Sequence, residues 1–217
     1  MSEIENMDIH FDKKAEDYDR HALNDLGMSE FYDEVEKQIS MCSKKDNILV
    51  LGCGTGLEIE RIKNDCTVTA IDISPNMLQK LKQKKLPQGI KLNTICGSYF
   101  DIPFDENSFD IVLSTYSLHH FKVEQKKVLY EKIYNCLKDG GCLINGDVTF
   151  DDKDMENTAL NNALEIYKDK NVPFGTLHID IPLTVDTEIE LLKGSRFSKI
   201  TVEKKWTHSS LLKAIKP

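Results

Sequence analysis

Three glycines at alternating positions are the first residues in this sequence with a clear chemical use. They lie in Gly52-Cys-Gly54-Thr-Gly56, directly after an apolar run that ends at Leu51. Glycines at such a place let the chain turn tightly and let a ligand approach the backbone closely. We expect a helix to begin at this loop, with its free N–H groups directed at the ligand.

The spacing of the glycines limits the class of ligand. A dinucleotide fingerprint needs a third glycine at the position of Leu57, and a phosphate-binding loop needs a Gly-Lys-Ser/Thr sequence that does not follow here. The loop therefore predicts a nucleoside-like ligand that carries no pyrophosphate. A nicotinamide dehydrogenase is disfavoured on the same grounds.

An aspartate ends the next apolar run. Asp72 follows the run 67–71 and comes 20 residues after Gly52. In a doubly wound sheet, a carboxylate at this place accepts the hydrogens of both ribose hydroxyls of a nucleoside. The alternative is an aspartate that caps the helix beginning near Ser74. We prefer the ribose role because the strand, the spacing and the glycine loop agree.

Four side chains are candidate general bases, namely Tyr116, His119, His120 and His178. The two adjacent histidines follow a predicted strand, at the sheet edge where ligands bind in such folds. Since adjacent side chains point in different directions, we expect only His119 to face the pocket; the alternative is a structural histidine bonded to backbone. His178 lies in a predicted lid. Asp147 ends another strand, where it either lines the pocket or caps a helix.

The elements that must position these residues alternate along the chain. Apolar runs at 47–51, 67–71, 90–96, 109–113 and 141–144 are typical of strands buried on both faces of a parallel sheet. A helix is predicted to begin at Ser74-Pro75, and a second apolar stripe from Leu129 to Leu137 ends at Asp139-Gly140-Gly141. The alternation predicts a doubly wound α/β fold. Two strands at 197–205 and 209–215 predict an antiparallel hairpin.

Two segments interrupt this alternation. Residues 1–45 are polar and helical in pattern, and we predict an N-terminal helical segment that packs on the sheet or forms half of a lid. Residues 46–217 form the main domain, with an insertion at about 150–183 that reads as a polar helix followed by an irregular loop. Insertions of this size are often functional lids.

Composition excludes several classes. Lys+Arg 28 against Asp+Glu 36 gives a net charge of −8, which disfavours broad nucleic-acid binding. No apolar stretch is long enough for a membrane helix, and no signal peptide is visible, so we expect a cytoplasmic protein. The six cysteines contain no Cys-x-x-Cys pair and read as reduced thiols, and the six histidines lack ligand spacing; we predict no metal site.

Residues 48–148 resemble a class I S-adenosylmethionine (SAM)-dependent methyltransferase of the small-molecule type (methyltransferase domain type 11/25). The resemblance rests on five stretches in the family's order: Val50–Gly56, Ala70–Leu78, Gly97–Asp110, Ser114–His120 and Leu137–Gly141. It implies a Rossmann-like, seven-stranded, mostly parallel sheet with an antiparallel C-terminal strand and helices on both faces. The cofactor it implies is SAM.

The resemblance also implies roles for single residues. The methionine and ribose parts of SAM would be lined by the loop residues Gly52, Cys53, Gly54, Thr55 and Gly56, and Asp72 would hold the ribose. Ile73 and Met77 would pack on the adenine, and Ser98 and Tyr99 would lie at the adenine amino group. Ser114 would present its backbone near the sulfonium, and Tyr18 would reach the carboxylate of SAM. Met77 could equally be ordinary core. Ser98 replaces the family's usual acid. Arg20 is a second candidate partner of the SAM carboxylate, or a surface arginine.

Three hypotheses about function follow. The first is a methyltransferase that acts on a small molecule by in-line displacement, as a monomer or homodimer, with rate supplied mainly by alignment and water exclusion. The second is a tRNA-modifying methyltransferase, which would need a clustered basic surface that the net charge does not favour. The third is a non-catalytic partner domain, although such a domain has no need of the glycine loop and Asp72.

Overall fold

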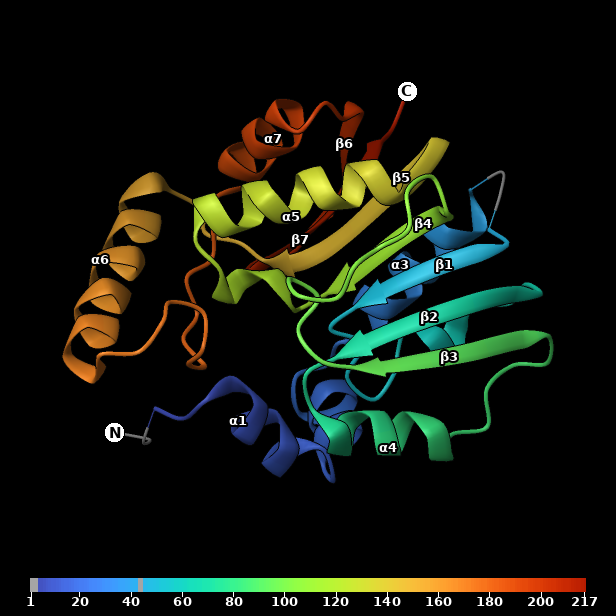
Figure 1. The fold of residues 1–217 in the computed structure, drawn as a ribbon, viewed down its shortest axis with the longest axis horizontal. Helices are drawn as coiled ribbons and strands as arrows, with labels where there is room; N and C mark the ends of the chain where they lie inside the picture. Colours follow the sequence, from blue (N-terminus) through green and yellow to red (C-terminus); the bar gives the residue numbers. More distant parts are fainter. Residues whose placement is uncertain (1–3, 43–44) are drawn as a thin grey trace.

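A single seven-stranded sheet organises the molecule (Figure 1). The computed structural model describes residues 4–42 and 45–217. In sheet order the strands are β3 (Ile90–Cys96), β2 (Cys66–Asp72), β1 (Asn47–Leu51), β4 (Phe109–Thr115), β5 (Leu137–Val148), β7 (Ser209–Ile215) and β6 (Ser198–Lys205). Neighbouring strands from β3 to β5 are parallel, whereas β7 is antiparallel to both β5 and β6. The predicted doubly wound fold with an antiparallel C-terminal strand is confirmed.

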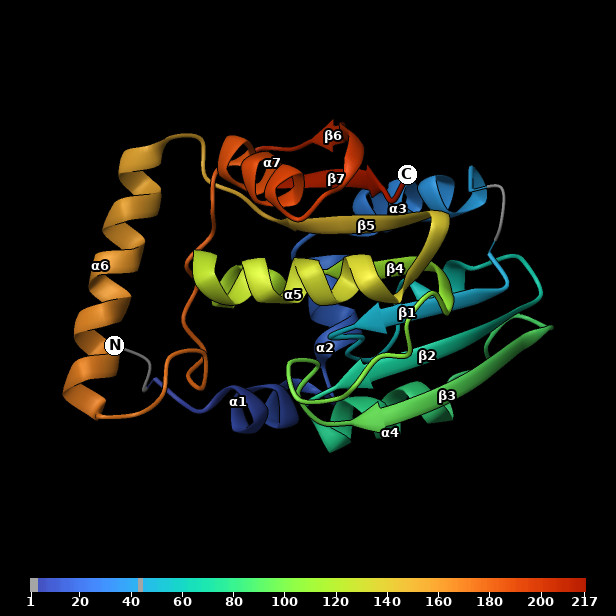
Figure 2. The same cartoon turned by 45° about the horizontal axis from the view of Figure 1, so that its top comes forward.

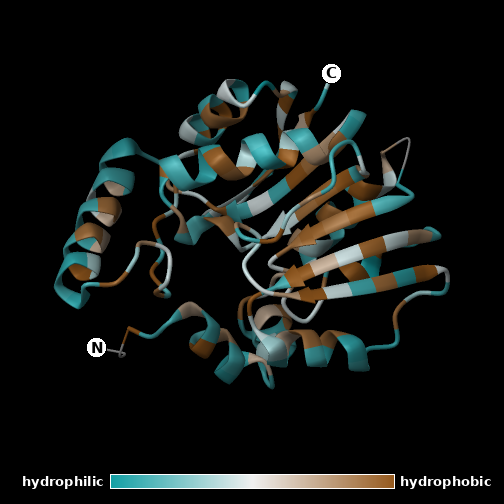
Figure 3. Ribbon diagram, in the orientation of Figure 1, coloured by the Kyte–Doolittle hydropathy of each residue, from teal (hydrophilic) through white to brown (hydrophobic). Residues whose placement is uncertain are grey.

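The central strands are apolar because both of their faces are covered. In β1, Ile48 and Val50 face one apolar layer, and Leu49 and Leu51 face the other. Figure 3 shows this as continuous brown in the middle of the sheet, while the edge strand β3 alternates in colour. β5 begins at Leu137, four residues before the predicted start, because a register shift in its pairing with β4 accommodates the glycines at 140 and 141.

Helices cover both faces. On the face of Ile48 and Val50 lie α3 (Ser29–Ser40) and α4 (Pro75–Gln83). On the opposite face lie α5 (Val123–Cys136) and α7 (Val185–Gly194), joined by a fully buried ion pair between Lys126 and Glu188. α4 begins as predicted, with Pro75 in the first turn and the Ser74 hydroxyl accepting a hydrogen bond from Met77 N.

The prediction of a helix directly after the glycine loop is wrong. Only a 3₁₀ turn, η2 (Ile59–Arg61), lies between Gly56 and β2. Chain length explains the difference. Nine residues, 57–65, must return along β1; as a helix they would span only roughly 14 Å, and a five-residue strand is already roughly 16 Å long. No residues would remain for the turns at either end.

The N-terminal segment divides into two parts. α3 packs on the sheet, where the Phe31 ring lies against Gly146. The preceding helices, α1 (Met7–Lys14), α2 (Tyr18–Arg20) and a π-helical turn η1 (His21–Asp25), lie near the carboxyl ends of the strands (Figure 2). The division of the chain at residues 45 and 46 stays a prediction.

The insertion meets this N-terminal segment. It contains α6 (Lys153–Lys170), which ends at the left-handed Asn171, followed by an irregular stretch at 171–184. Two backbone hydrogen bonds join the segments, from Met7 N to Thr176 O (2.9 Å) and from His178 N to Glu5 O (3.0 Å). Figure 2 shows the stretch after α6 running beside α1. In the part of the chain that is described, no helix combines the length and apolarity of a membrane span.

Candidate functional site

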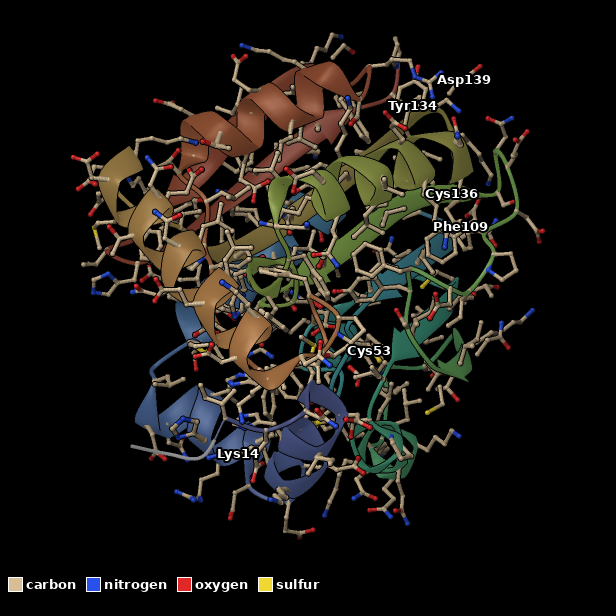
Figure 4. The ribbon with its side chains drawn as sticks, turned by 60° about the vertical axis from the view of Figure 1, so that its left-hand side comes forward. Lys14, Cys53, Phe109, Tyr134, Cys136 and Asp139 are labelled. Carbon is tan, nitrogen blue, oxygen red and sulfur yellow. The ribbon has the colours of Figure 1, made fainter. Side chains whose placement is uncertain are left out.

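A cavity of about 330 Å³ opens at the carboxyl ends of the parallel strands. Figure 4 labels Cys53, whose loop lies between the sheet and the N-terminal helices that carry Lys14. The cavity is lined by Met7, Phe11, Tyr18, Gly52, Gly54, Asp72, Ile73, Met77, Gly97, Ser98, Tyr99, Phe100, Asp101, Thr115, Tyr116, Ser117, His120, Phe121, Gln125, Phe174, Gly175 and Thr176. It therefore draws on the glycine loop, three strand ends and both lid candidates.

The first two glycines of the loop are cavity residues. Gly52 has φ +64°, and a Cβ there would lie 2.0 Å from the Ser117 Oγ, so no larger residue fits. The third glycine has another purpose: a Cβ on Gly56 would lie 2.5 Å from the Leu81 Cδ1 of α4. Gly56 is thus a packing residue. It was predicted to line the cofactor site, and it does not line the cavity.

Asp72 joins the glycine loop to the second strand. Its Oδ2 accepts a hydrogen bond from Gly54 N (2.7 Å) and its Oδ1 accepts one from Ser74 N (2.8 Å). Burial raises the pKa of this carboxyl to about 6, against the opposing effect of these N–H donors. Each oxygen keeps a free lone pair, so the carboxylate can accept two hydroxyl hydrogens from a ligand in the cavity.

Both apolar and polar side chains line the cavity next to Asp72. Ile73, Met77, Ser98 and Tyr99 all line the cavity, as predicted for the adenine end. Ser98 Oγ is already engaged by Phe100 N (3.2 Å). Asp101 also lines the cavity and was missed in the sequence; the signal was an acid only three residues after the position where the family has one.

The other end of the cavity is aromatic. Phe11, Tyr116, Phe121 and Phe174 contribute rings from three separate segments. Tyr116 has φ +48°, a costly conformation for a residue with a side chain, and such strain clusters at functional sites. Among the described residues, no lysine or arginine lines the cavity, whereas two aspartates do.

A cluster of histidines and carboxylates lies beside this aromatic end. His119, on the 3₁₀ turn η3 (Leu118–His120), has its Nδ1 2.5 Å from Asp147 Oδ1 and its Nε2 3.5 Å from Asp180 Oδ1. His120 Nδ1 is 3.1 Å from the same Asp180 oxygen. Burial disfavours the charged imidazole of His119, but the charge of Asp147 and its hydrogen bond outweigh burial and raise the pKa of His119. Burial lowers the pKa of His120.

The structure changes the choice between these two histidines. His120 lines the cavity and His119 does not, because Asp147 holds the His119 ring away from it. Asp147, which also accepts a hydrogen bond from Leu118 N, is therefore a buried support and not a cavity residue. His178 is also outside the lining: its ring stacks on His10 at a centroid distance of 3.7 Å.

Four further predicted residues lie near the cavity without lining it. Cys53 and Thr55 are buried under the loop, the Thr55 hydroxyl being bonded to Asp19. Ser114 is fully buried in β4 and does not line the cavity, and the contact predicted for its backbone stays a prediction. Arg20 is exposed and pairs with Asp17 and Asp25. Tyr18 does line the cavity, and burial raises the pKa of its hydroxyl.

Sequence reasoning also missed Glu58. This carboxyl is buried, and burial raises its pKa to about 7. The Thr115 hydroxyl lies 3.4 Å from Oε2, and Oε1 has no partner. The signal was available, since a glutamate stands between two buried apolar residues, Leu57 and Ile59.

Comparisons with known proteins agree with this geometry. Residues 48–141 match the family profile described as a methyltransferase domain. A carboxy-S-adenosyl-L-methionine synthase of Nautilia profundicola is 25% identical over 190 residues, which are 80% of this chain and 79% of that protein. An uncharacterized methyltransferase of Bacillus cereus is 29% identical over 71% of this chain and 73% of that protein. The matched domain, these relatives and the fold together identify a class I SAM-dependent methyltransferase.

Solved structures of methyltransferases share the fold. A candidate O-methyltransferase of Nostoc punctiforme superposes with a TM-score of 0.72 at 17% identity, covering 100% of this chain and 64% of that one. Human N-acetylserotonin methyltransferase in complex with SAM gives 0.62 at 18% identity, covering 85% and 51%.

The residues of this methyltransferase fit SAM. Asp72 offers two acceptor oxygens, and Gly52 and Gly54 leave a passage at the sheet edge that a Cβ on Gly52 would close. Ile73 and Met77 provide an apolar wall for an aromatic base. The cofactor supplies an activated methyl group on a positively charged sulfur.

Proposed function

We propose that this methyltransferase transfers the methyl group of SAM to a small-molecule acceptor, which binds between the cofactor and the two lid segments. One observation carries the proposal: Met7 and Phe11 of the N-terminal segment and Phe174 of the insertion line the same cavity as Gly52 and Asp72. A volume of about 330 Å³ falls in the range of small-molecule sites. A nucleotide within a folded tRNA would require both segments to move away.

The charge of the lining favours one class of acceptor. Aromatic rings with two aspartates, and no lysine or arginine among the described lining residues, suit a neutral or cationic acceptor such as an amine. Carboxy-SAM, named in several relatives, carries one carboxylate more than SAM. Such a product would lie here beside carboxylates with no cation to pair it, so the amine class is the better fit.

Positioning supplies most of the rate in an in-line displacement. We assign the ribose to Asp72, the adenine to Ile73 and Met77, and contact with the acceptor to Tyr116. The phenol of Tyr116 stays protonated at neutral pH, since burial raises its pKa, so it can donate a hydrogen bond. His119 acts through His120 and not on the acceptor, and His178 holds the N-terminal segment in place through His10.

An acceptor screen tests this function. Purified enzyme is incubated with methyl-labelled SAM and three matched sets of small amines, phenols and carboxylates, and label transfer is counted. We expect transfer to amines or phenols, and we expect Phe174→Ala to raise the acceptor KM several-fold while SAM affinity changes less than threefold. Transfer only to RNA, or release of a carboxylated SAM, would replace the proposal.

A further inference from the structure

The strongest unassigned feature is the group of side chains that joins the insertion to the body of the protein. We propose that His119, His120 and Asp180 bind a divalent transition-metal ion such as Zn²⁺. The three residues offer donor atoms that all lie within 4.8 Å of one another. Two come from η3 and the third comes from the insertion, 60 residues further along the chain. This site adjoins the SAM cavity through His120, and its occupancy can be measured without any methyl transfer.

The distances fit a shared ion. Asp180 Oδ1 lies 3.5 Å from His119 Nε2 and 3.1 Å from His120 Nδ1. Nitrogen and oxygen donors about 2.1 Å from one metal lie roughly 3.0–3.4 Å from each other in tetrahedral or octahedral geometry. The two measured separations are therefore close to the edges of a coordination polyhedron. Two histidines and one carboxylate also form a donor set used by metal sites with open positions.

A supporting carboxylate is already in place. Metal-binding histidines commonly donate their second ring N–H to a carboxylate, which fixes the orientation of the ring. Asp147 Oδ1, 2.5 Å from His119 Nδ1, makes this contact, and it leaves Nε2 of the same ring directed at Asp180.

The second histidine presents Nδ1 to the proposed site and has its other ring nitrogen unpartnered. His120 is 2% exposed, and its Nε2 is buried without any hydrogen-bond partner. An unpartnered imidazole nitrogen in a buried site is costly. If Nδ1 binds the ion, the ion replaces the present contact of Nδ1 with Ile179 O (3.3 Å), and Nε2 carries the proton of a ring that lines the cavity. A bound ion would thus connect the insertion to the acceptor end of the cavity.

Metal titration tests this site directly. All proteins carry Cys96→Ser, because Cys96 is an exposed thiol that could bind Zn²⁺ itself. Chelator-treated protein is titrated with Zn²⁺ by calorimetry and with Co²⁺ by visible absorption. We expect one ion per chain with a Kd below about 10 μM, and a thermal midpoint that rises with Zn²⁺ concentration.

Two variants and one control locate the ion. Asp180→Asn removes one donor from a side chain that is 55% exposed, so the fold should persist, and we expect Zn²⁺ affinity to fall at least tenfold. Asp147→Asn should cost about 10–100-fold. His21→Ala is the control, because His21 and Asp25 form a pair at the same 3.1 Å distance without a third donor.

The outcomes separate the alternatives. Absence of a stoichiometric site, or equal Zn²⁺ affinity in Asp180→Asn and in the parent, would overturn the proposal and leave these residues as a hydrogen-bonded contact of the insertion. Loss of affinity in His21→Ala would move the site to the surface. SAM affinity is measured on the same samples: unchanged SAM binding with no metal site overturns this inference alone and leaves the proposed function standing.

Discussion

The two ends of the cavity are built in different ways. The cofactor end uses residues 52–77, where a loop, a strand end and a helix start follow one another and are tied by hydrogen bonds to Asp72. The proposed acceptor end collects side chains from residues 7–18, 116–125 and 174–176, which meet only in the folded chain. The cofactor end is therefore fixed by local geometry, and the acceptor end depends on two segments that hold each other through backbone hydrogen bonds.

Removing the Asp72 carboxylate should give the largest effect. Asp72→Ala takes away the acceptors for the ribose and also releases Gly54 N and Ser74 N. We expect SAM and S-adenosylhomocysteine to bind at least tenfold more weakly, by similar factors, in calorimetric titrations. Asp101→Ala, at the same cavity, is the control and should cost less. Unchanged affinity in a folded Asp72→Ala protein would show that the ribose lies elsewhere.

Two glycines with the same backbone conformation isolate the effect of crowding at the cofactor end. Gly52 (φ +64°) and Gly27 (φ +63°) both have left-handed conformations, but a Cβ meets Ser117 at the first and nothing within 4 Å at the second. Gly27→Ala should lower the free energy of unfolding by about 1 kcal/mol, from strain alone. Gly52→Ala should cost about 1–3 kcal/mol more, since overpacking is added.

Denaturant unfolding of both variants measures this difference. Ser117→Gly in the Gly52→Ala background should recover part of the added cost, because it removes the side chain that the new Cβ meets. Equal costs at the two positions would mean that the loop can shift, and that the cofactor end is less rigid than described.

The smallest expected effect is the pH dependence of SAM affinity, which follows from protons released on binding. Burial raises the pKa of Asp72 to about 6 and that of Glu58 to about 7 in the free protein. The positive charge of SAM favours the ionised carboxylates, so binding should release protons near pH 6.5, and affinity should rise with pH between about 5.5 and 7.5. S-adenosylhomocysteine, which lacks the sulfonium charge, should release fewer.

Calorimetry in buffers of different ionisation enthalpy counts the protons. Glu58→Gln should reduce the difference between the numbers of protons released on binding SAM and S-adenosylhomocysteine. The same groups affect stability: the folded state keeps protons that the unfolded state loses from about pH 4, so the free energy of unfolding should fall as pH rises towards 7. A SAM affinity that does not vary with pH would remove Glu58 from the cofactor end.

The cofactor end of the cavity was predicted from the sequence more completely than the proposed acceptor end, for a physical reason. The fold and the positions of Gly52, Gly54 and Asp72 followed from local patterns, because each pattern is built by consecutive residues. The cofactor class and the positions of Ile73 and Met77 came from the resemblance to a family, whose motifs are also runs of consecutive residues. The preference for His119 over His120 was wrong, since the ring that faces the cavity depends on Asp147 from another strand. Glu58 was not singled out, and its burial accompanies the 3₁₀ turn that stands where a helix was expected.

That short turn also has an electrostatic consequence. A long helix starting at the glycine loop would bring about half a positive charge to the cavity through its aligned peptide dipoles. Such a charge attracts a pyrophosphate but repels a sulfonium. With only Ile59–Arg61 in 3₁₀ conformation at this place, few peptide dipoles add up there. The loop therefore repels a cationic cofactor less than a helix N-terminus would. It also attracts the pyrophosphate of a nucleotide diphosphate less strongly.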